Sequence, residues 1–228
     1  MKGILKLFIC LMFSILNILC ISQTNDNVLV ADSSLITKYS SYKFKFGGGC
    51  GFGGAFVKPL GNFSEIRNDY GSGNVLILFS YGRIIYYIDI VLGNSKAHGT
   101  FQNSDLVIIE DSIVAVSSFE NSLGYLVLDR RRVLAYPWVG ISTTTVMQNN
   151  GIVNNEGPYR TTGIAGLTLG YRFGDVFSKS MIGSFEVRSR IAYTKLEYYD
   201  NLDVSNLRIG ISFIFHIRGA EKRIEKNK

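Results

Sequence analysis

The segment LRIGISFIFHI, residues 207–217, decides the fold class of this chain of 228 residues. Its side chains alternate between two chemical characters along the whole segment. One face would carry Leu207, Ile209, Ile211, Phe213, Phe215 and Ile217, and the other Arg208, Gly210, Ser212, Ile214 and His216. Successive side chains of a β-strand point to opposite faces, so this period of two predicts a strand with one apolar face and one mostly polar face.

The same alternation recurs in seven other segments, which predicts an all-β chain of eight strands. It is clearest in residues 163–173 and 183–193. The remaining strands are expected in residues 42–46, 75–81, 84–92, 119–127 and 133–144. Pro137 leaves the face assignment of the 133–144 strand open, because proline cannot donate a ladder hydrogen bond.

The links between these strands alternate in length. The short links are residues 81–83, 129–132 and 174–180, and the long polar links are residues 58–73, 93–112, 146–160 and 197–206. An even strand number with alternating short and long links is typical of an outer-membrane barrel. The sequence therefore predicts an eight-stranded antiparallel transmembrane β-barrel with short periplasmic turns and longer external loops.

Charged residues on the polar faces predict a network inside the barrel. They are Lys43, Lys45, Asp89, Glu120, Arg172, Glu186, Arg188, Arg190 and Arg208. An eight-stranded barrel is only wide enough for side chains to fill it, and a lone charge in such a lumen is costly. We therefore expect these opposite charges to pair and to plug most of the lumen.

Aromatic residues on the apolar faces lie near the strand ends, where a membrane barrel carries its interfacial rings. The candidates are Tyr42, Tyr81, Tyr125, Tyr136, Trp138, Tyr171, Phe173, Tyr193, Phe213 and Phe215. Alternation alone does not decide which face is inside. A soluble secreted barrel that binds a small apolar ligand in its interior is therefore an alternative.

The N-terminal residues predict export. Lys2 and Lys6 precede an apolar run, and Cys20 and Ser22 are small residues placed for cleavage, so residues 1–22 read as a signal peptide. Residues 23–41 are then expected to form a flexible leader, residues 42–217 the barrel, and residues 218–228 a charged tail. Cleavage would leave Cys50 as the sole cysteine, which excludes an intramolecular disulfide.

The chain resembles the small outer-membrane β-barrel proteins of Gram-negative bacteria, in the broad OmpA-like and opacity-protein-like group. The resemblance rests on the export signal, on GIAGLTLGYRF at residues 163–173 and on the segment 207–217. It implies the outer membrane as location, its lipid and the barrel assembly machinery as partners, and a structural or surface-interaction role. Any extracellular ligand would contact the links 58–73, 93–112 and 146–160. The charged residues after Ile217 depart from the aromatic ending common in that group.

Several other functions are disfavoured by the sequence. The formal net charge is +6, but basic residues are dispersed, so no nucleic-acid partner is expected. Residues 49–54 match G-x-G-x-x-G, but no helical pattern follows, so no cofactor is expected. Two distant histidines and the one cysteine expected to remain after cleavage predict no metal site. A lipid A-modifying enzyme stays an alternative, in which the catalytic base would be His98 beside Ser95 or Ser104.

Overall fold

The computed structural model describes residues 42–103, 106–130, 132–149, 154–177, 181–199 and 201–222. The expected signal peptide and leader lie outside these residues. No helix in the described ranges is long and apolar enough to cross a membrane.

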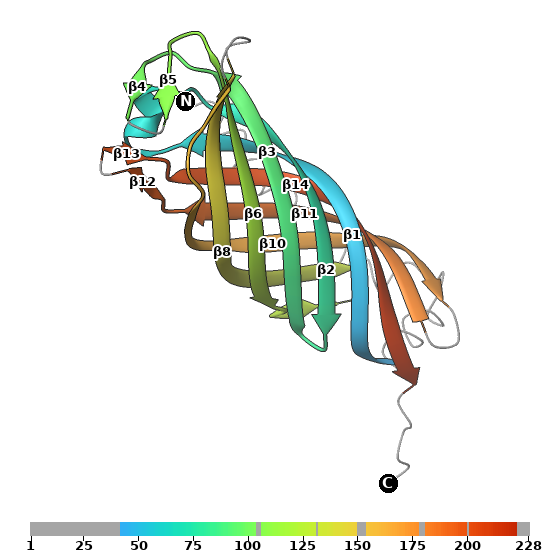
Figure 1. Ribbon diagram of the computed structural model, residues 1–228. Helices are drawn as coiled ribbons and strands as arrows, with labels where there is room; N and C mark the ends of the chain where they lie inside the picture. The colour runs from blue at the N-terminus through green and yellow to red at the C-terminus, as the bar shows by residue number, and fades with distance from the viewer. Residues whose placement is uncertain are drawn as a thin grey trace. The chain divides into compact units, whose positions relative to one another are not determined.

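Eight long strands form one closed sheet (Figure 1). They are β1 (Tyr42–Pro59), β2 (Tyr70–Tyr81), β3 (Ile84–Lys96), β6 (Ile113–Tyr125), β8 (Val133–Asn149), β10 (Arg160–Phe177), β11 (Met181–Thr194) and β14 (Asn206–Lys222). Each strand pairs antiparallel with the next in this order, and β14 lies beside β1 and closes the circle. The prediction of an eight-stranded antiparallel barrel is confirmed.

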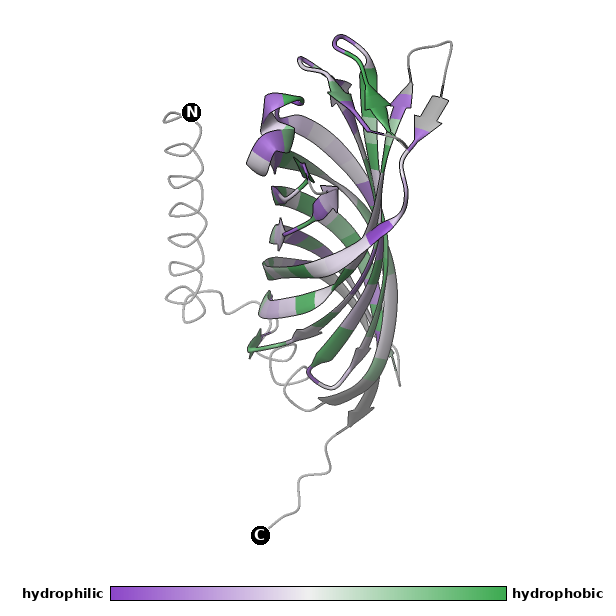
Figure 2. Cartoon of the chain, turned by 60° about the vertical axis from the view of Figure 1, so that its left-hand side comes forward, coloured by the Kyte–Doolittle hydropathy of each residue, from purple (hydrophilic) through white to green (hydrophobic). Residues whose placement is uncertain are grey.

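The alternation of faces follows the prediction in the clearest strands. In β14, Ile211 and Phe213 are about half exposed on the outside, whereas Ile214 and His216 are buried inside. Figure 2 shows apolar and polar residues alternating along the strands of the wall. Because the ladder hydrogen bonds satisfy the backbone all round the barrel, only the side chains distinguish inside from outside.

The strands are longer than the sequence indicates. The strand β6 begins at Ile113 rather than at residue 119, and β14 continues to Lys222, past the expected end at Ile217. Arg218 therefore belongs to a strand and is buried, not part of a solvated tail. Backbone pairing continues where the apolar alternation fades, because a ladder needs partners for its N–H and C=O groups but no particular side chain.

The long links are also more structured than the predicted polar loops. They contain a 3-10 helix, η1 (Gly61–Glu65), and the short strands β4 (Phe101–Gln102), β5 (Val107–Ile108), β9 (Asn154–Glu156), β12 (Glu197–Tyr199) and β13 (Leu202–Asp203). These elements gather at one end of the barrel, here called the loop end, and the β2–β3 turn lies at the opposite turn end (Figure 1). Apolar side chains of the links pack with the strand tops into one cluster, here called the cap cluster. Its members are Phe63, Ile66, Ala97, Phe101, Leu106, Ile108, Val114, Val116, Val146, Leu196, Tyr198, Leu202 and Val204.

The strand β8 has Pro137 in its interior without losing its place in the sheet. The pairing of β6 with β8 ends at Trp138, and the short strand β7 (Leu128–Asp129) pairs with β8 only from Ala135. Pro137 lies in the gap between these two ladders. A missing backbone donor is tolerated at such an irregular place in a sheet.

The glycine-rich stretch of β1 has a steric cause. Gly49, Gly51 and Gly53 alternate along the strand, and a Cβ at each would collide with a backbone carbonyl oxygen of β14. The seam between the first and last strands therefore requires hydrogen in place of a side chain at these positions. This close approach accounts for Gly49 and Gly51, the first two glycines of the G-x-G-x-x-G pattern, whereas a Cβ at the third, Gly54, would meet only the Ser72 carbonyl oxygen at 3.5 Å.

Candidate functional site

The lumen collects most of the charged residues expected there. Asp89, Glu120, Arg172, Glu186, Arg188, Arg190 and Arg208 all project inward from their strands and are buried or nearly so. The side chains of Lys43 and Lys45 lie outside the described residues. The seven described charges form three groups along the barrel, which contact different neighbours.

The group nearest the turn end surrounds Glu186. Its carboxylate accepts hydrogen bonds from Arg172 Nε at 2.9 Å and Arg188 Nε at 2.8 Å. Arg172 also donates through Nη1 to Asp129 at 2.6 Å, and Arg188 donates through Nη1 to the Tyr136 hydroxyl at 2.8 Å. The Glu186 carboxylate thus compensates the two buried guanidinium groups, and Asp129 supplies a second carboxylate to Arg172.

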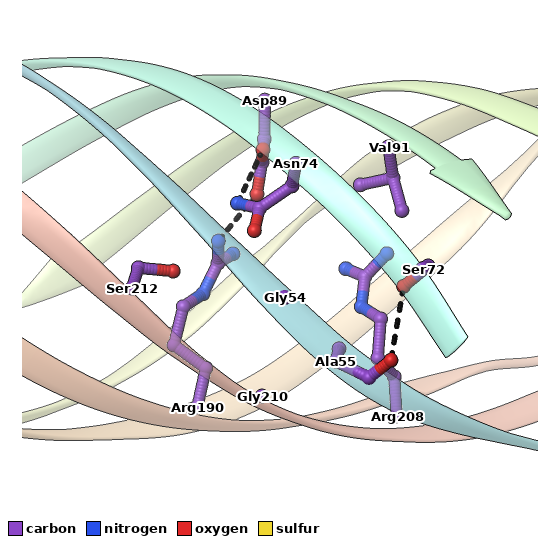
Figure 3. Close-up of a pocket in the computed structure, with 10 residues that line it drawn as sticks. All are labelled: Gly54, Ala55, Ser72, Asn74, Asp89, Val91, Arg190, Arg208, Gly210 and Ser212. Carbon is purple, nitrogen blue, oxygen red and sulfur yellow. Dashed lines mark hydrogen bonds and ion pairs between the residues drawn. The ribbon is translucent and has the colours of Figure 1, made fainter.

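The middle group joins Asp89 to Arg190 (Figure 3). Asp89 also accepts a hydrogen bond from Asn74 Nδ2 at 2.9 Å. The Arg190 guanidinium lies 4.7 Å from the centroid of the Trp138 ring and 5.3 Å from that of Tyr87. A weakly hydrated guanidinium stacks well on aromatic faces, so these rings supply contacts that water would otherwise provide.

The group nearest the loop end is a bidentate pair. Arg208 donates from Nη1 and Nη2 to the two carboxylate oxygens of Glu120, at 2.8 and 2.6 Å. This parallel geometry is the strongest form of the arginine–carboxylate contact. It ties β14 to β6 across the lumen.

The prediction that Trp138 and Tyr136 are interface aromatics is wrong. Both rings are buried in the lumen rather than exposed to lipid, and Trp138 Nε1 donates to Thr168 Oγ1 at 3.1 Å. The reason is the register of β8, whose even-numbered residues 134–140 point inward. They belong to an apolar layer in the lumen that the sequence reasoning missed: Leu76, Leu78, Ile85, Tyr87, Leu126, Leu134, Tyr136, Trp138, Ile164, Ala192 and Ile214.

The other described aromatic candidates project outward. They are Tyr81, Tyr125, Tyr171, Phe173, Tyr193, Phe213 and Phe215. The Tyr42 side chain lies outside the described residues. Phe185, which was not among the candidates, lies between Phe173 and Phe215 with ring centroids 6.2 and 5.0 Å away. Aromatic rings therefore gather on the outside near the turn end.

Arg67 is a buried cation at the loop end that the sequence reasoning also missed. Its Nε donates to Ser95 Oγ at 2.6 Å, and its guanidinium carbon lies 3.5 Å from the centroid of the Tyr70 ring. Burial lowers the pKa of Arg67 to about 10. The group remains charged at neutral pH, because that value is still well above 7.

Among the hydrogen bonds of the described residues, none joins the His98 ring to the serine hydroxyl or carboxylate that the enzyme alternative requires. The His98 side chain is exposed, and its backbone N–H donates to the carbonyl of Ile66. Ser95 is engaged by Arg67. Ser104 lies outside the described residues.

The spaces left inside the lumen are small. Two cavities of about 20 Å³ each lie beside the Asp89–Arg190 and Glu120–Arg208 pairs, and Figure 3 shows the residues that line the first. A third, of about 10 Å³, lies at the turn end. A cavity of roughly 10–15 Å³ on this measure holds about one water molecule.

Comparisons with known proteins found similarity only among solved structures. No family model and no curated protein matches the chain. Neisserial surface protein A is 12% identical, with 76% of this chain and 96% of that one covered and a TM-score of 0.49. Ail of Yersinia pestis is 11% identical, with 78% and 99% covered and a TM-score of 0.40. OprG of Pseudomonas aeruginosa is 8% identical, with 78% and 97% covered and a TM-score of 0.39.

Proposed function

We propose that this chain is an outer-membrane β-barrel protein of a Gram-negative bacterium with a structural or surface-interaction role. The observation that carries the proposal is the distribution of side chains across the wall. Large apolar residues such as Val75, Leu92 and Val139 are around 60% exposed on the outside, whereas the ionic residues are buried. Hydrocarbon is the solvent in which such an exterior is stable.

The same observation argues against the soluble alternative. A soluble monomer rarely exposes a continuous apolar patch of more than a few hundred Å². Here outward apolar residues recur on all eight strands, from Phe52 on β1 to Phe213 on β14. A barrel with this exterior would aggregate in water, and its interior is too full of ion pairs to hold an apolar ligand.

The contents of the lumen favour a plugged barrel over a pore. Three ionic groups and the apolar layer fill the lumen, and the two cavities beside the ion pairs hold about one or two water molecules each. A wide aqueous channel needs roughly 16 strands. We therefore infer that the barrel serves as an anchor rather than a diffusion channel.

The loop end is the part that would meet an external partner. The cap cluster holds the described parts of the links 58–73, 93–112 and 197–206 against the strand tops, so these parts would present a defined surface to a partner. Lipid of the outer membrane and the barrel assembly machinery are the other partners that this proposal requires.

Membrane fractionation combined with gel mobility tests the proposal. The protein should be recovered with the outer membrane and resist carbonate extraction, and unboiled samples should migrate differently from boiled ones, because a closed barrel resists SDS until heated. Recovery in the detergent-free soluble fraction, with the same migration before and after boiling, would contradict it.

A further inference from the structure

An open groove on the outer wall crosses β2, β3, β6 and β8 near the loop end. These four strands are consecutive in the sheet and lie side by side (Figure 1). The groove has a volume of about 540 Å³, within the roughly 300–1,000 Å³ of ordinary ligand pockets. The outward residues that line it are Gly71, Gly73, Leu92, Asn94, Ala115 and Met147.

The groove lies between two rows of larger outward side chains. Val75, Ile90 and Phe119 lie opposite one another on the side of the turn end, and Lys96 lies opposite Ile113 on the side of the loop end. The outward positions between these rows include two glycines and an alanine, so the wall recedes there.

The protein itself does not require glycine at positions 71 and 73. A Cβ on Gly71 would meet nothing within 4 Å, and one on Gly73 would meet only the Gly53 carbonyl oxygen at 4.0 Å. The seam glycines Gly49 and Gly51 differ, because a Cβ there would collide with β14. Glycine inside a strand weakens it and often marks a place where a ligand approaches closely. The two groove glycines therefore point to a ligand outside the wall.

The groove lies where the hydrocarbon of a membrane would end. The outward residues of β3 are apolar or aromatic from Ile84 to Leu92 and polar at Asn94 and Lys96. At about 3.4 Å per residue, Ile84 to Leu92 spans about 27 Å along a tilted strand, which covers most of the roughly 25 Å of apolar band on a membrane barrel. The part of the groove beside Leu92 would therefore face acyl chains, and the part beside Asn94 would face head groups.

Lys96 places a positive charge at the head-group side of the groove. Its side chain is exposed, and no ion pair within the described ranges includes it. Lys96 is two residues beyond Asn94 on the same face, so it lies about 7 Å further toward the loop end. A lysine ammonium in this place can pair with the phosphate of a lipid head group.

We propose that this groove binds lipid A, with an acyl chain beside Gly73 and Leu92 and a phosphate on Lys96. An amphipathic lipid with an anionic head matches a groove that is apolar on one side and faces a free cation on the other. Lipid A is the phosphorylated lipid of the external leaflet, which the loop end would meet. This inference rests on the proposed outer-membrane location and adds a specific lipid site to it.

Native mass spectrometry of the folded full chain in detergent tests the site. The protein is titrated separately with diphosphorylated lipid A, with dephosphorylated lipid A and with phosphatidylglycerol, and the bound fractions give the dissociation constants. The variants are Gly73→Leu, which places a side chain in the groove, and Lys96→Gln, which removes the charge. Heat-dependent gel mobility selects the folded fraction of each variant.

Each variant has a matched control. Gly163→Leu makes the same substitution at an outward glycine of β10, where a Cβ would also meet nothing within 4 Å. Lys195→Gln removes another mostly exposed lysine of the loop end, which pairs with Glu197.

We expect the wild type to bind one lipid A per chain, more tightly than phosphatidylglycerol. Gly73→Leu should weaken this binding at least about 10-fold, because each buried methylene that is displaced changes affinity about fourfold. Lys96→Gln should weaken it about fivefold, the usual scale for one lysine near anionic lipid, and should leave the binding of dephosphorylated lipid A unchanged. Gly163→Leu and Lys195→Gln should bind as the wild type does.

The absence of bound lipid A on the folded wild type would overturn the proposal. Equal losses in Gly73→Leu and Gly163→Leu, or in Lys96→Gln and Lys195→Gln, would also overturn it, and so would phosphatidylglycerol bound as tightly as lipid A. Membrane fractionation separates these failures from failure of the proposed function. A chain recovered with the outer membrane that binds no lipid A would refute this site alone.

Discussion

Replacing Glu186 with alanine should lower the free energy of unfolding of the barrel by about 3–5 kcal/mol, the cost typical of breaking a buried ion pair. Glu186 is fully enclosed and accepts hydrogen bonds from both Arg172 and Arg188. Its removal leaves the Arg188 guanidinium in the lumen with no carboxylate of its own. Arg172 would retain its contacts to Asp129 and to the carbonyl of Arg130.

Urea titration in lipid vesicles, followed by the fluorescence of the single tryptophan, measures this loss. The matched control is Glu197→Ala. Glu197 pairs with Lys195 at 3.5 Å, but both side chains are mostly exposed, so its loss should cost no more than about 1 kcal/mol. Equal effects of the two substitutions would mean that the lumen network contributes no more than a surface pair.

The substitution Ile77→Arg should destabilise the barrel in the membrane by about 2–4 kcal/mol, the cost of a cation at the bilayer midplane on the lipid face. Ile77 projects outward from β2 between Val75 and Phe79, in the middle of the apolar run. The control is Tyr81→Arg at the turn end of the same strand, where the cost falls to about 0–1 kcal/mol.

The same vesicle titration compares the two arginine variants. Positions 77 and 81 are both exposed on the same strand. A larger loss of stability for Ile77→Arg than for Tyr81→Arg therefore shows that position 77 faces hydrocarbon and position 81 does not. If Ile77→Arg unfolded at the same urea concentration as Tyr81→Arg, the middle of the wall would not lie in lipid.

The fold and the identity of the lumen charges could be predicted from the sequence, because both follow from a local period of two. Residues such as Glu186 and Arg208 are assigned to a face by their immediate neighbours alone. In a barrel the assignment of one face then fixes the inside and the outside of every strand.

Trp138 and the cap cluster could not be predicted in this way. Both faces of β8 carry apolar residues around Pro137, so composition alone did not mark Trp138 as inward; the alternation of Leu134, Tyr136 and Trp138 with smaller residues was the available signal. The apolar residues of the links, such as Phe63 and Phe101, are scattered among polar ones without a period. Their shared cluster depends on how the barrel brings the links together.

The contacts of the His216 ring with the Ser80 hydroxyl and the Glu186 carboxylate in the lumen are non-local for the same reason. Ser80 and His216 are 136 residues apart, and His216 and Glu186 are 30 apart. The register of β11 on β14, the closure of β14 on β1 and the pairing of β1 with β2 together bring them to one level of the lumen. The register cannot be read from the sequence, so the sequence predicts which residues point inward but not which of them touch.

Quenching of tryptophan fluorescence by lipids brominated on their acyl chains measures most directly which side chains touch hydrocarbon. In the wild-type chain, Trp138 should be only weakly quenched, because its ring stacks on Arg190 inside the barrel. In a Trp138→Phe background, Ile77→Trp should be strongly quenched. Strong quenching of Trp138 together with weak quenching at position 77 would mean that the faces of the wall are reversed.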